Sequence, residues 1–493
     1  MDVGTTKITN PKHIEDSFIA DLAVKDAVAV QEVEIDPALE RKLRWKIDLY
    51  LMPALWILLV FSYIDRSNLG NARVAGMYTD LKLKDKDYYH AVVTFQVGYL
   101  IAGTPSNMVL VRARPSLYIP ALMFLWGTCA TCLGAVQNKH QLLAVRFLLG
   151  ITEAGFAPGV FFLISSWYKR EEQSVSTSMI NAYRSLSSSF RSKRFIFFLS
   201  ASILSGAFGG IIAGLIARHL NGAQGLPGWR WLFIVEGTLT AGISFIVPFF
   251  LLDFPATSKR LSPEEKKMAI ARLAKEDITS RNANVATRLT HWRAFISAIT
   301  NWRLYFLALP YMQLVGSSAL AYFYPYLIQG LGYTAINAQF MTAPLYVVAL
   351  AIAIPTSILA DKFSTKRSLF VATIMLIGSV FCGLATGIRA YIPRYVFLCF
   401  INSAIWTGSP IALSYATSQL GPVDTETRAI SLGIVNGLSQ LAQVYGSALF
   451  PSRDAPDYLV GFGTYTGLFA VGSIIAFAGH FLLRKYPYRA DFE

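Results

Sequence analysis

Charged residues are scarce in this chain, and several patterns that mark catalytic or ATP-driven proteins are missing. Only 15% of the 493 residues are charged and 54% are hydrophobic, whereas about a quarter of the residues in a soluble protein are charged. The six histidines lack zinc-ligand spacing, and the sequence has neither a G-x-x-x-x-G-K-[ST] loop nor a nucleophile elbow. We therefore expect no metal, no cofactor and no enzyme activity, and the composition predicts an all-α polytopic membrane protein.

Cysteine is also rare, and its placement argues against a disulfide framework. Cys129 and Cys132 have the spacing of a metal or redox pair, but no second pair and no histidine accompanies them. Cys382 and Cys399 lie alone in apolar stretches. Small apolar packing residues are the better interpretation of all four.

The net charge of +14 does not indicate a nucleic-acid partner. Basic residues gather in the connections between apolar stretches, as the positive-inside rule describes for membrane proteins. A basic cluster precedes the first apolar stretch and predicts a cytoplasmic N-terminus; it consists of Arg41, Lys42, Arg44 and Lys46.

Twelve apolar stretches predict twelve transmembrane helices, six on each side of a long polar connection. They are residues 49–63, 89–111, 116–136, 142–167, 194–217, 230–252, 303–328, 338–360, 367–387, 394–415, 429–450 and 461–483. An even number returns the C-terminus to the cytoplasm, where Arg484, Lys485 and Arg489 satisfy the charge rule.

This pattern predicts two related six-helix bundles with a site at their interface. The expected divisions are a cytoplasmic tail (1–44), an N-terminal bundle (45–252), a cytoplasmic linker (253–302), a C-terminal bundle (303–483) and a cytoplasmic tail (484–493). In the linker, Ser262 and Glu265 form a capping-box pattern that starts an amphipathic helix. We expect this helix to lie along the cytoplasmic face.

The serine-rich segment 175–192 interrupts the connection between the fourth and fifth stretches. It is either a phosphorylatable cytoplasmic loop or an insertion from a retained intron or alternative splice form, and loop-length priors favour neither.

The fourth stretch, Leu142–Trp167, carries two opposite charges inside an apolar run. Arg146 and Glu153 are seven residues apart and so fall on nearly the same helix face. A charge at membrane depth costs about 2.5–3.5 kcal/mol on insertion scales, so this face needs a bundle interior or an aqueous cavity. One interpretation is a structural ion pair that locks two helices; we favour a path for an anion and a proton. Small residues allow a second helix to approach closely, namely Gly150, Ala154, Gly155, Ala157 and Gly159.

A second acid–base pair, Asp65 and Arg66, follows the first stretch beside Asn68 and Asn71. Such a pair at a helix end can be a simple interfacial stop signal. Together with the fourth stretch, however, it provides two carboxylates that can carry protons and two guanidiniums that can bind a carboxylate with two hydrogen bonds. Proton-coupled uptake of an organic anion needs these groups.

Over residues 42–485 the sequence resembles the major facilitator superfamily and, within it, the fungal allantoate and nicotinate permease branch of the anion:cation symporters. The motifs that carry the resemblance are residues 65–73, Pro105-Ser106-Asn107, residues 146–155, Gly228-Trp229-Arg230-Trp231 and the loop signature 360–367. The loop signature after the second stretch keeps Arg112 and Arg114 without their acidic partner.

The resemblance implies the major facilitator fold and a role for each motif residue. Asp65 and Glu153 would be the protonatable pair, Arg66 would contact the substrate carboxylate, and Arg146 would organise the carboxylates. Residues that match cavity or gating positions of the family are Tyr99, Ser403, Trp406 and Asn436 in the cavity and Asp361, Lys362, Lys366 and Arg367 in the gating loop. Gln440 and Tyr324 are further cavity candidates that no motif supports.

We therefore expect a monomeric secondary transporter of the plasma membrane, with both termini cytoplasmic, that takes up a small organic anion with protons by alternating access. Its partners would be the substrate, protons and the lipid bilayer. Two alternatives remain open at the level of sequence: an exporter of an acidic metabolite, and a membrane nutrient sensor that transports nothing.

Overall fold

The computed structural model describes residues 37–168, 188–255, 257–272, 291–421, 423 and 425–486, and the regular structure in these residues is helical. All twelve expected spans are present as continuous or interrupted helices. In the N-terminal half they are α2 (Pro37–Ala72), α4 (Asp85–Arg112), α5 (Pro115–Leu133), α6 (Lys139–Glu153) with α7 (Phe156–Trp167), α9 (Ser188–His219) and α10 (Gly228–Ser244). In the C-terminal half they are α13 (Trp302–Ser317) with α14 (Tyr324–Gly330), α15 (Ala335–Phe340) with α16 (Thr342–Lys362), α17 (Arg367–Gly387), α18 (Tyr391–Gln419), α19 (Thr425–Gly446) and α20 (Leu459–Lys485).

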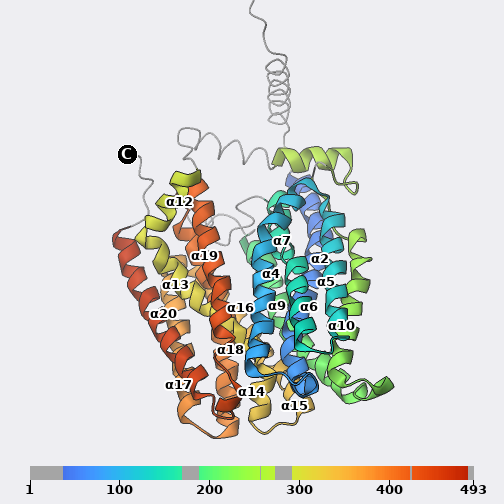
Figure 1. The fold of residues 1–493 in the computed structure, drawn as a ribbon. Helices are drawn as coiled ribbons and strands as arrows, with labels where there is room; N and C mark the ends of the chain where they lie inside the picture. The colour runs from blue at the N-terminus through green and yellow to red at the C-terminus, as the bar shows by residue number, and fades with distance from the viewer. Residues whose placement is uncertain are drawn as a thin grey trace, which may run out of the picture.

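The two halves stand side by side (Figure 1). We call the end that carries α12 (His291–Thr300) and the helical residues 263–272 the linker end, and the opposite end, with α14 and α15, the far end. Within the described residues, nine helical stretches are long and apolar enough to cross a membrane by length and composition. The spans outside these nine are α4, α6 with α7, and α19.

Local sequence explains where several helices begin. The Asn138 side chain accepts a hydrogen bond from the Gln141 amide at the start of α6, and Thr334 does the same for Asn337 at the start of α15. These side chains satisfy amide donors that have no partner within the first helical turn. α5 instead begins with Pro115, whose missing N–H costs nothing at that position.

The expectation that residues 142–167 form one helix is wrong. α6 ends at Glu153 and α7 begins at Phe156, with Ala154 and Gly155 in a turn between them. Pro158 explains this break, because it has no N–H to donate to the carbonyl of Ala154. The seventh span is interrupted as well: residues 318–322 are a 3₁₀ turn between α13 and α14, and Pro325 lies in the first turn of α14.

The expectation that Asp65 and Arg66 end the first helix is also wrong. α2 continues to Ala72, and residues 73–77 then form a π-helical turn in which Gly76 has a φ of 102°. Asp65 and Arg66 therefore lie inside a helix, and the simple stop-signal interpretation does not apply to them.

The linker forms the expected capping box. The Ser262 hydroxyl accepts from the Glu265 amide at 3.1 Å, and the Glu265 carboxylate accepts from the Ser262 amide at 2.8 Å. Glu265 also pairs with Lys46 of α2 at 2.8 Å, and the helix that follows lies across the linker end of the N-terminal half (Figure 1). Of the serine-rich segment 175–192, residues 175–187 lie outside the described part, and 188–192 begin α9.

The two halves meet closely at the far end. The Tyr88 hydroxyl of α4 donates to the Tyr322 carbonyl at 3.0 Å, and Arg73 donates to the Ser452 hydroxyl at 2.9 Å. Gly70 lies against the same Tyr322 carbonyl, where a Cβ would clash with the backbone. The far end is therefore closed in this structure.

Candidate functional site

Glu153 is the centre of a buried charged cluster in the N-terminal half. One oxygen of its carboxylate accepts hydrogen bonds from Arg66 Nε at 2.6 Å and from the Ser62 hydroxyl at 2.5 Å. Ser62 and Arg66 are one turn apart on α2, so a single face of that helix holds the carboxylate of α6. Glu153 is fully buried, and its second oxygen has no hydrogen-bond partner in the described structure.

Arg146 does not pair with Glu153, so the interpretation of these two residues as a locking ion pair is wrong. Seven residues along a helix separate the two positions by about 10 Å along its axis, and Glu153 binds Arg66 of another helix instead. The Arg146 side chain is 1% exposed, and its Nε and Nη2 atoms lack hydrogen-bond partners among the described residues. Arg146 thus places an unpaired positive charge inside the bundle.

Gly150, Gly155 and Gly159, among the small residues expected to admit a neighbouring helix, do so, and that neighbour is α4. A Cβ on Gly150 would clash with the Phe95 carbonyl, and one on Gly155 would clash with the Ser106 side chain. This close approach sets α4, with its aromatic residues, beside the charged cluster.

Asp65 lies next to this cluster with a neutral partner. The Thr240 hydroxyl of α10 donates to one carboxyl oxygen at 3.1 Å, and the other oxygen has no partner in the described residues. α10 also contributes Glu236, which accepts a hydrogen bond from the Asn68 amide and is 2% exposed. The sequence analysis missed Glu236, although it is the only acidic residue in the expected span 230–252. The rule that identified Arg146 and Glu153 would have identified it too.

Aromatic rings surround the Arg66 guanidinium. Its central carbon lies 4.7 Å from the ring centre of Tyr99, 5.4 Å from that of Phe95 and 5.7 Å from that of Tyr63. Tyr99 therefore lies beside Arg66, close enough to contact a molecule bound to the guanidinium. Trp406 of α18 packs edge-on against Tyr63, with ring centres 5.9 Å apart, and brings the C-terminal half to the same place.

The other cavity candidates lie in different surroundings. Ser403 is buried, and its hydroxyl donates to the Cys399 carbonyl of its own helix, whereas Asn436 is exposed on α19. Tyr324 is buried and donates to Asn402 at 2.9 Å. Within the described residues, no hydrogen bond joins these side chains to the charged cluster.

Gln440 belongs to a polar contact between the two halves. It accepts a hydrogen bond from Gln443 of the same helix, and Gln443 in turn accepts one from Gln96 of α4 at 2.7 Å. Because α4 and α19 belong to different halves, this amide chain would have to break or rearrange if the halves moved apart there.

The predicted gating residues lie at the linker end, in the turn from α16 to α17. Arg367 pairs with Asp361 at 3.0 Å, and Arg484 of α20 donates to the Thr365 carbonyl at 3.3 Å. Lys362 and Lys366 are exposed. The turn is therefore tied to both of its own helices and to α20.

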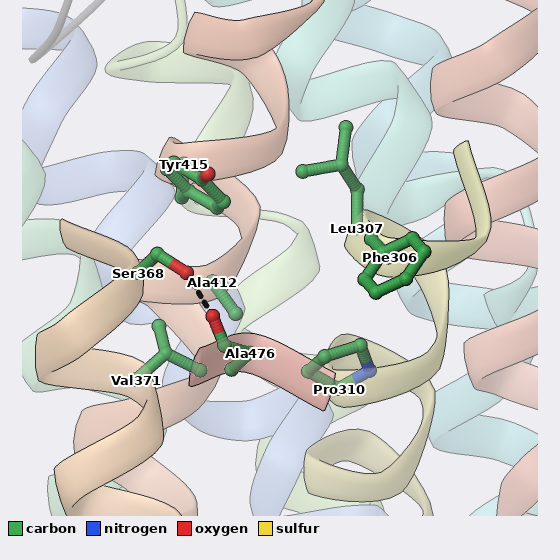
Figure 2. Close-up of a pocket in the computed structure, with 8 residues that line it drawn as sticks. All are labelled: Phe306, Leu307, Pro310, Ser368, Val371, Ala412, Tyr415 and Ala476. Atoms are coloured by element: carbon green, nitrogen blue, oxygen red, sulfur yellow. Dashed lines mark hydrogen bonds between the residues drawn. The ribbon is translucent and has the colours of Figure 1, made fainter. Parts of the chain in front are cut away.

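A pocket in the C-terminal half does not fit an anion. It lies between α13, α17, α18 and α20 and is lined mainly by apolar side chains, as Figure 2 shows. Its polar side chains are Ser368, whose hydroxyl already donates to the Ala476 carbonyl at 2.5 Å, and Tyr415. It has no charged lining residue, so the charged cluster is the better candidate site.

Comparisons with known proteins agree with this fold. The family model of the Major Facilitator Superfamily matches residues 55–447. The chain is 32% identical to the "MFS transporter prlL" of Fungal sp. (strain NRRL 50135), covering 92% of this chain and 89% of that one. It is 26% identical to a protein of Agrobacterium vitis whose name proposes a tartrate transporter, over 89% of this chain and 94% of that one.

A solved structure described as a D-xylose-proton symporter has the same fold. It superposes with a TM-score of 0.61 at 16% identity, over 88% of this chain and 97% of that one. The family match spans most of both helical halves, including the charged cluster of α2, α6 and α10. The chain therefore belongs to the Major Facilitator Superfamily, and it is a membrane transporter rather than an enzyme.

Proposed function

We propose that this transporter takes up a small organic anion together with a proton by alternating access, as a member of the anion:cation symporter branch that its motifs resemble. In this proposal it acts as a monomer in the plasma membrane with both termini in the cytoplasm. The far end is then the outer face, and the closed contacts around Tyr322 and Ser452 block the outer entrance.

One observation carries the proposal: the Arg66 guanidinium is held by a single buried carboxylate, Glu153, at 2.6 Å. A hydrogen bond to an ionised carboxylate is about twice as strong as one to a neutral group. A proton on Glu153 therefore loosens the bond to Arg66 and leaves the guanidinium able to bind the carboxylate of a substrate. Proton binding and anion binding thus depend on each other.

The surroundings of Arg66 favour a small substrate with an apolar or aromatic part. Tyr63 and Tyr99 offer ring surfaces beside the guanidinium, and Trp406 of the C-terminal half packs against Tyr63. The unpaired charge of Arg146 makes a negative ligand in the same cluster more favourable. The relative from Agrobacterium vitis, named for a dicarboxylate, is consistent with a carboxylate substrate.

The test is accumulation of labelled nicotinate, allantoate, pantothenate and tartrate in cells that express the protein, at external pH 5 and pH 7. We expect one of these acids to accumulate faster at the acidic pH and a protonophore to stop it. Glu264→Gln, at an exposed position of the linker helix, serves as a matched carboxylate control. Faster efflux from preloaded expressing cells, without uptake, would instead identify an exporter.

A further inference from the structure

α2 and α10 are joined by two buried polar contacts one helical turn apart. Asp65 accepts from Thr240, and Asn68 donates to Glu236. All four side chains are at most 2% exposed. The contacts leave three acceptor oxygens unpartnered in the described structure, one each on Asp65, Asn68 and Glu236. Trp126 Nε1 of α5, beside Asp65, is a buried donor without a partner in the described residues, so the unpartnered acceptors of this seam still outnumber its donors.

Among the described residues, no charged group forms an ion pair with Asp65 or Glu236. On α2, Arg66 is bound to Glu153, and Arg73 of the following turn is bound to Asp85 at 3.3 Å. On α10 itself, Arg230 donates to the Gly134 and Val136 carbonyls.

The other elements packed against α10 bring no closer cation. α5 and residues 247–249 contain no acidic or basic side chain, and their ionisable groups are Tyr118, Cys129 and Cys132. Among the described side chains of α9, the basic residues are Arg218 and His219 at the far end. Arg146 of α6 donates to neither carboxyl group through its Nε and Nη2 atoms, which have no hydrogen-bond partner in the described residues.

Two neighbouring carboxylates without a cation cannot both remain ionised in a buried site. A proton on one of them removes the surplus charge and supplies the missing donor. Glu236 is the better holder, because Asn68 already binds one of its oxygens and the other is free to carry the hydrogen. Asp65, which lies closer to the Arg66–Glu153 pair along α2, is then free to gain and lose a proton.

We propose that Glu236 remains protonated through the transport cycle and donates a hydrogen bond to the Asp65 carboxylate, so that it sets the external pH at which Asp65 accepts the coupling proton on its way to Glu153. This inference rests on the proposed function and adds to it a positioning residue on α10. It also balances the cluster: the guanidiniums of Arg66 and Arg146 face the carboxylates of Glu153 and Asp65, with Glu236 neutral.

The test is the pH profile of uptake in Glu236→Gln, normalised to surface abundance. An amide donates a weaker hydrogen bond to the Asp65 carboxylate than a carboxylic acid does. In Glu236→Gln the ionised form of Asp65 is therefore less stable, and Asp65 binds its proton more readily. We expect the midpoint of acid-stimulated uptake to move to higher pH by about half to one unit. Thr240→Val removes the hydrogen bond to Asp65 observed at 3.1 Å. It serves as the positive control, because it should move the pH midpoint of uptake in the same direction.

An unchanged midpoint in Glu236→Gln, or one that moves to lower pH, at normal surface abundance and with Thr240→Val shifted, would overturn this inference alone. If Glu236→Gln lowers uptake but leaves the KM and the pH midpoint of the remaining activity unchanged, Glu236 is only a structural contact. If the wild type itself shows no acid-stimulated uptake of any tested anion, the proposed function fails instead. Glu264→Gln should match the wild type throughout.

Discussion

In the N-terminal half, Asp65, Arg146, Glu153 and Glu236 are buried within the membrane spans, whereas the buried arginines described in the C-terminal half, Arg367 and Arg394, lie in the first turns of their helices. Arg394, in the first turn of α18, shows the contrast best. It donates to the carbonyls of Ala385, Pro456 and Asp457, and it pairs with the Asp457 carboxylate at 3.3 Å. Arg146, in the middle of α6, has no hydrogen-bond partner for Nε or Nη2 among the residues that the structure describes.

This difference separates charged groups that hold the fold together from charged groups that can exchange their partner for a ligand or a proton. A guanidinium whose donors are directed at backbone carbonyls and a neighbouring carboxylate holds helix ends together and has little left to offer a ligand. The N-terminal cluster instead contains an ion pair that a proton can loosen and polar atoms without partners. The C-terminal half contributes aromatic and amide surface, such as Trp406 and Gln443, that can shape a site without charging it.

The largest expected effect comes from Glu153→Gln, which keeps the shape of the protonated side chain and removes its charge. We expect gradient-driven accumulation to be lost while exchange of substrate between loaded carriers continues, because the empty carrier can no longer release a proton. Surface abundance, counterflow exchange and acid-driven uptake measure this. Normal pH-dependent accumulation would remove Glu153 from the proton path and leave Asp65 as the remaining candidate.

A smaller effect is expected when an arginine of the N-terminal cluster, Arg66, or one at a helix end of the C-terminal half, Arg394, is replaced by lysine. Arg66→Lys should raise the apparent KM by roughly ten- to a hundredfold, because loss of the two-pronged contact costs about 1.5–3 kcal/mol. Arg394→Lys should instead lower surface abundance and leave the KM of the remaining protein unchanged. Equal KM changes in both variants would contradict the division between the halves.

A substitution of Trp406 tests the contribution of the C-terminal half, and we expect a smaller effect from it. Its ring contacts with Tyr63 and Tyr346 are each worth about 0.5–1.5 kcal/mol. Trp406→Leu should therefore change the KM by about two- to tenfold and alter the preference among substrates. The pH midpoint of uptake should stay where it is, and a shift of that midpoint would show that the C-terminal half takes part in proton binding.

The smallest effect concerns the pair of Lys46 and Glu265 at the linker end. Burial raises the pKa of Glu265, but the hydrogen bonds from Lys46 and the Ser262 amide outweigh it and leave the pKa below its ordinary value. The stabilisation is thus present at neutral pH and is lost as the pH falls through this lowered pKa. Lys46→Ala should cost about 0.2–1 kcal/mol, measured as a lower melting temperature in detergent at pH 7 that disappears once the pH falls below the lowered pKa of Glu265. Equal losses at both pH values would indicate lost packing instead of lost charge.

Hydropathy and charge predicted most of the fold, because a bilayer allows few alternatives to apolar helices with basic cytoplasmic connections. The breaks in the fourth and seventh spans were predictable in principle from Pro158 and Pro325. The length of α2 was not, since Asp65 and Asn68 reduce local hydropathy and only their partners on α10 explain why the helix continues.

The candidate site could be predicted residue by residue but not contact by contact. Sequence spacing puts Arg146 and Glu153 on one face of one helix, yet the partner of Glu153 depends on how α2 is rotated against α6. The rotation of α6 itself results from packing against its neighbours, such as the contact of Gly150 with the Phe95 carbonyl of α4. Glu236 required no structure to be noticed, but only the structure shows that it faces Asn68.

The charge balance of the cluster has an electrical consequence. A membrane potential acts on each elementary charge that crosses the bilayer with about 2.3 kcal/mol per 100 mV. In the proposed cycle the empty cluster is neutral, and a monocarboxylate that enters with one proton leaves it neutral. Transport of such a substrate would then carry no current and would respond to the pH difference alone. A dicarboxylate with one proton would carry one negative charge inward, against the interior-negative potential of a resting cell, and its uptake would speed up on depolarisation.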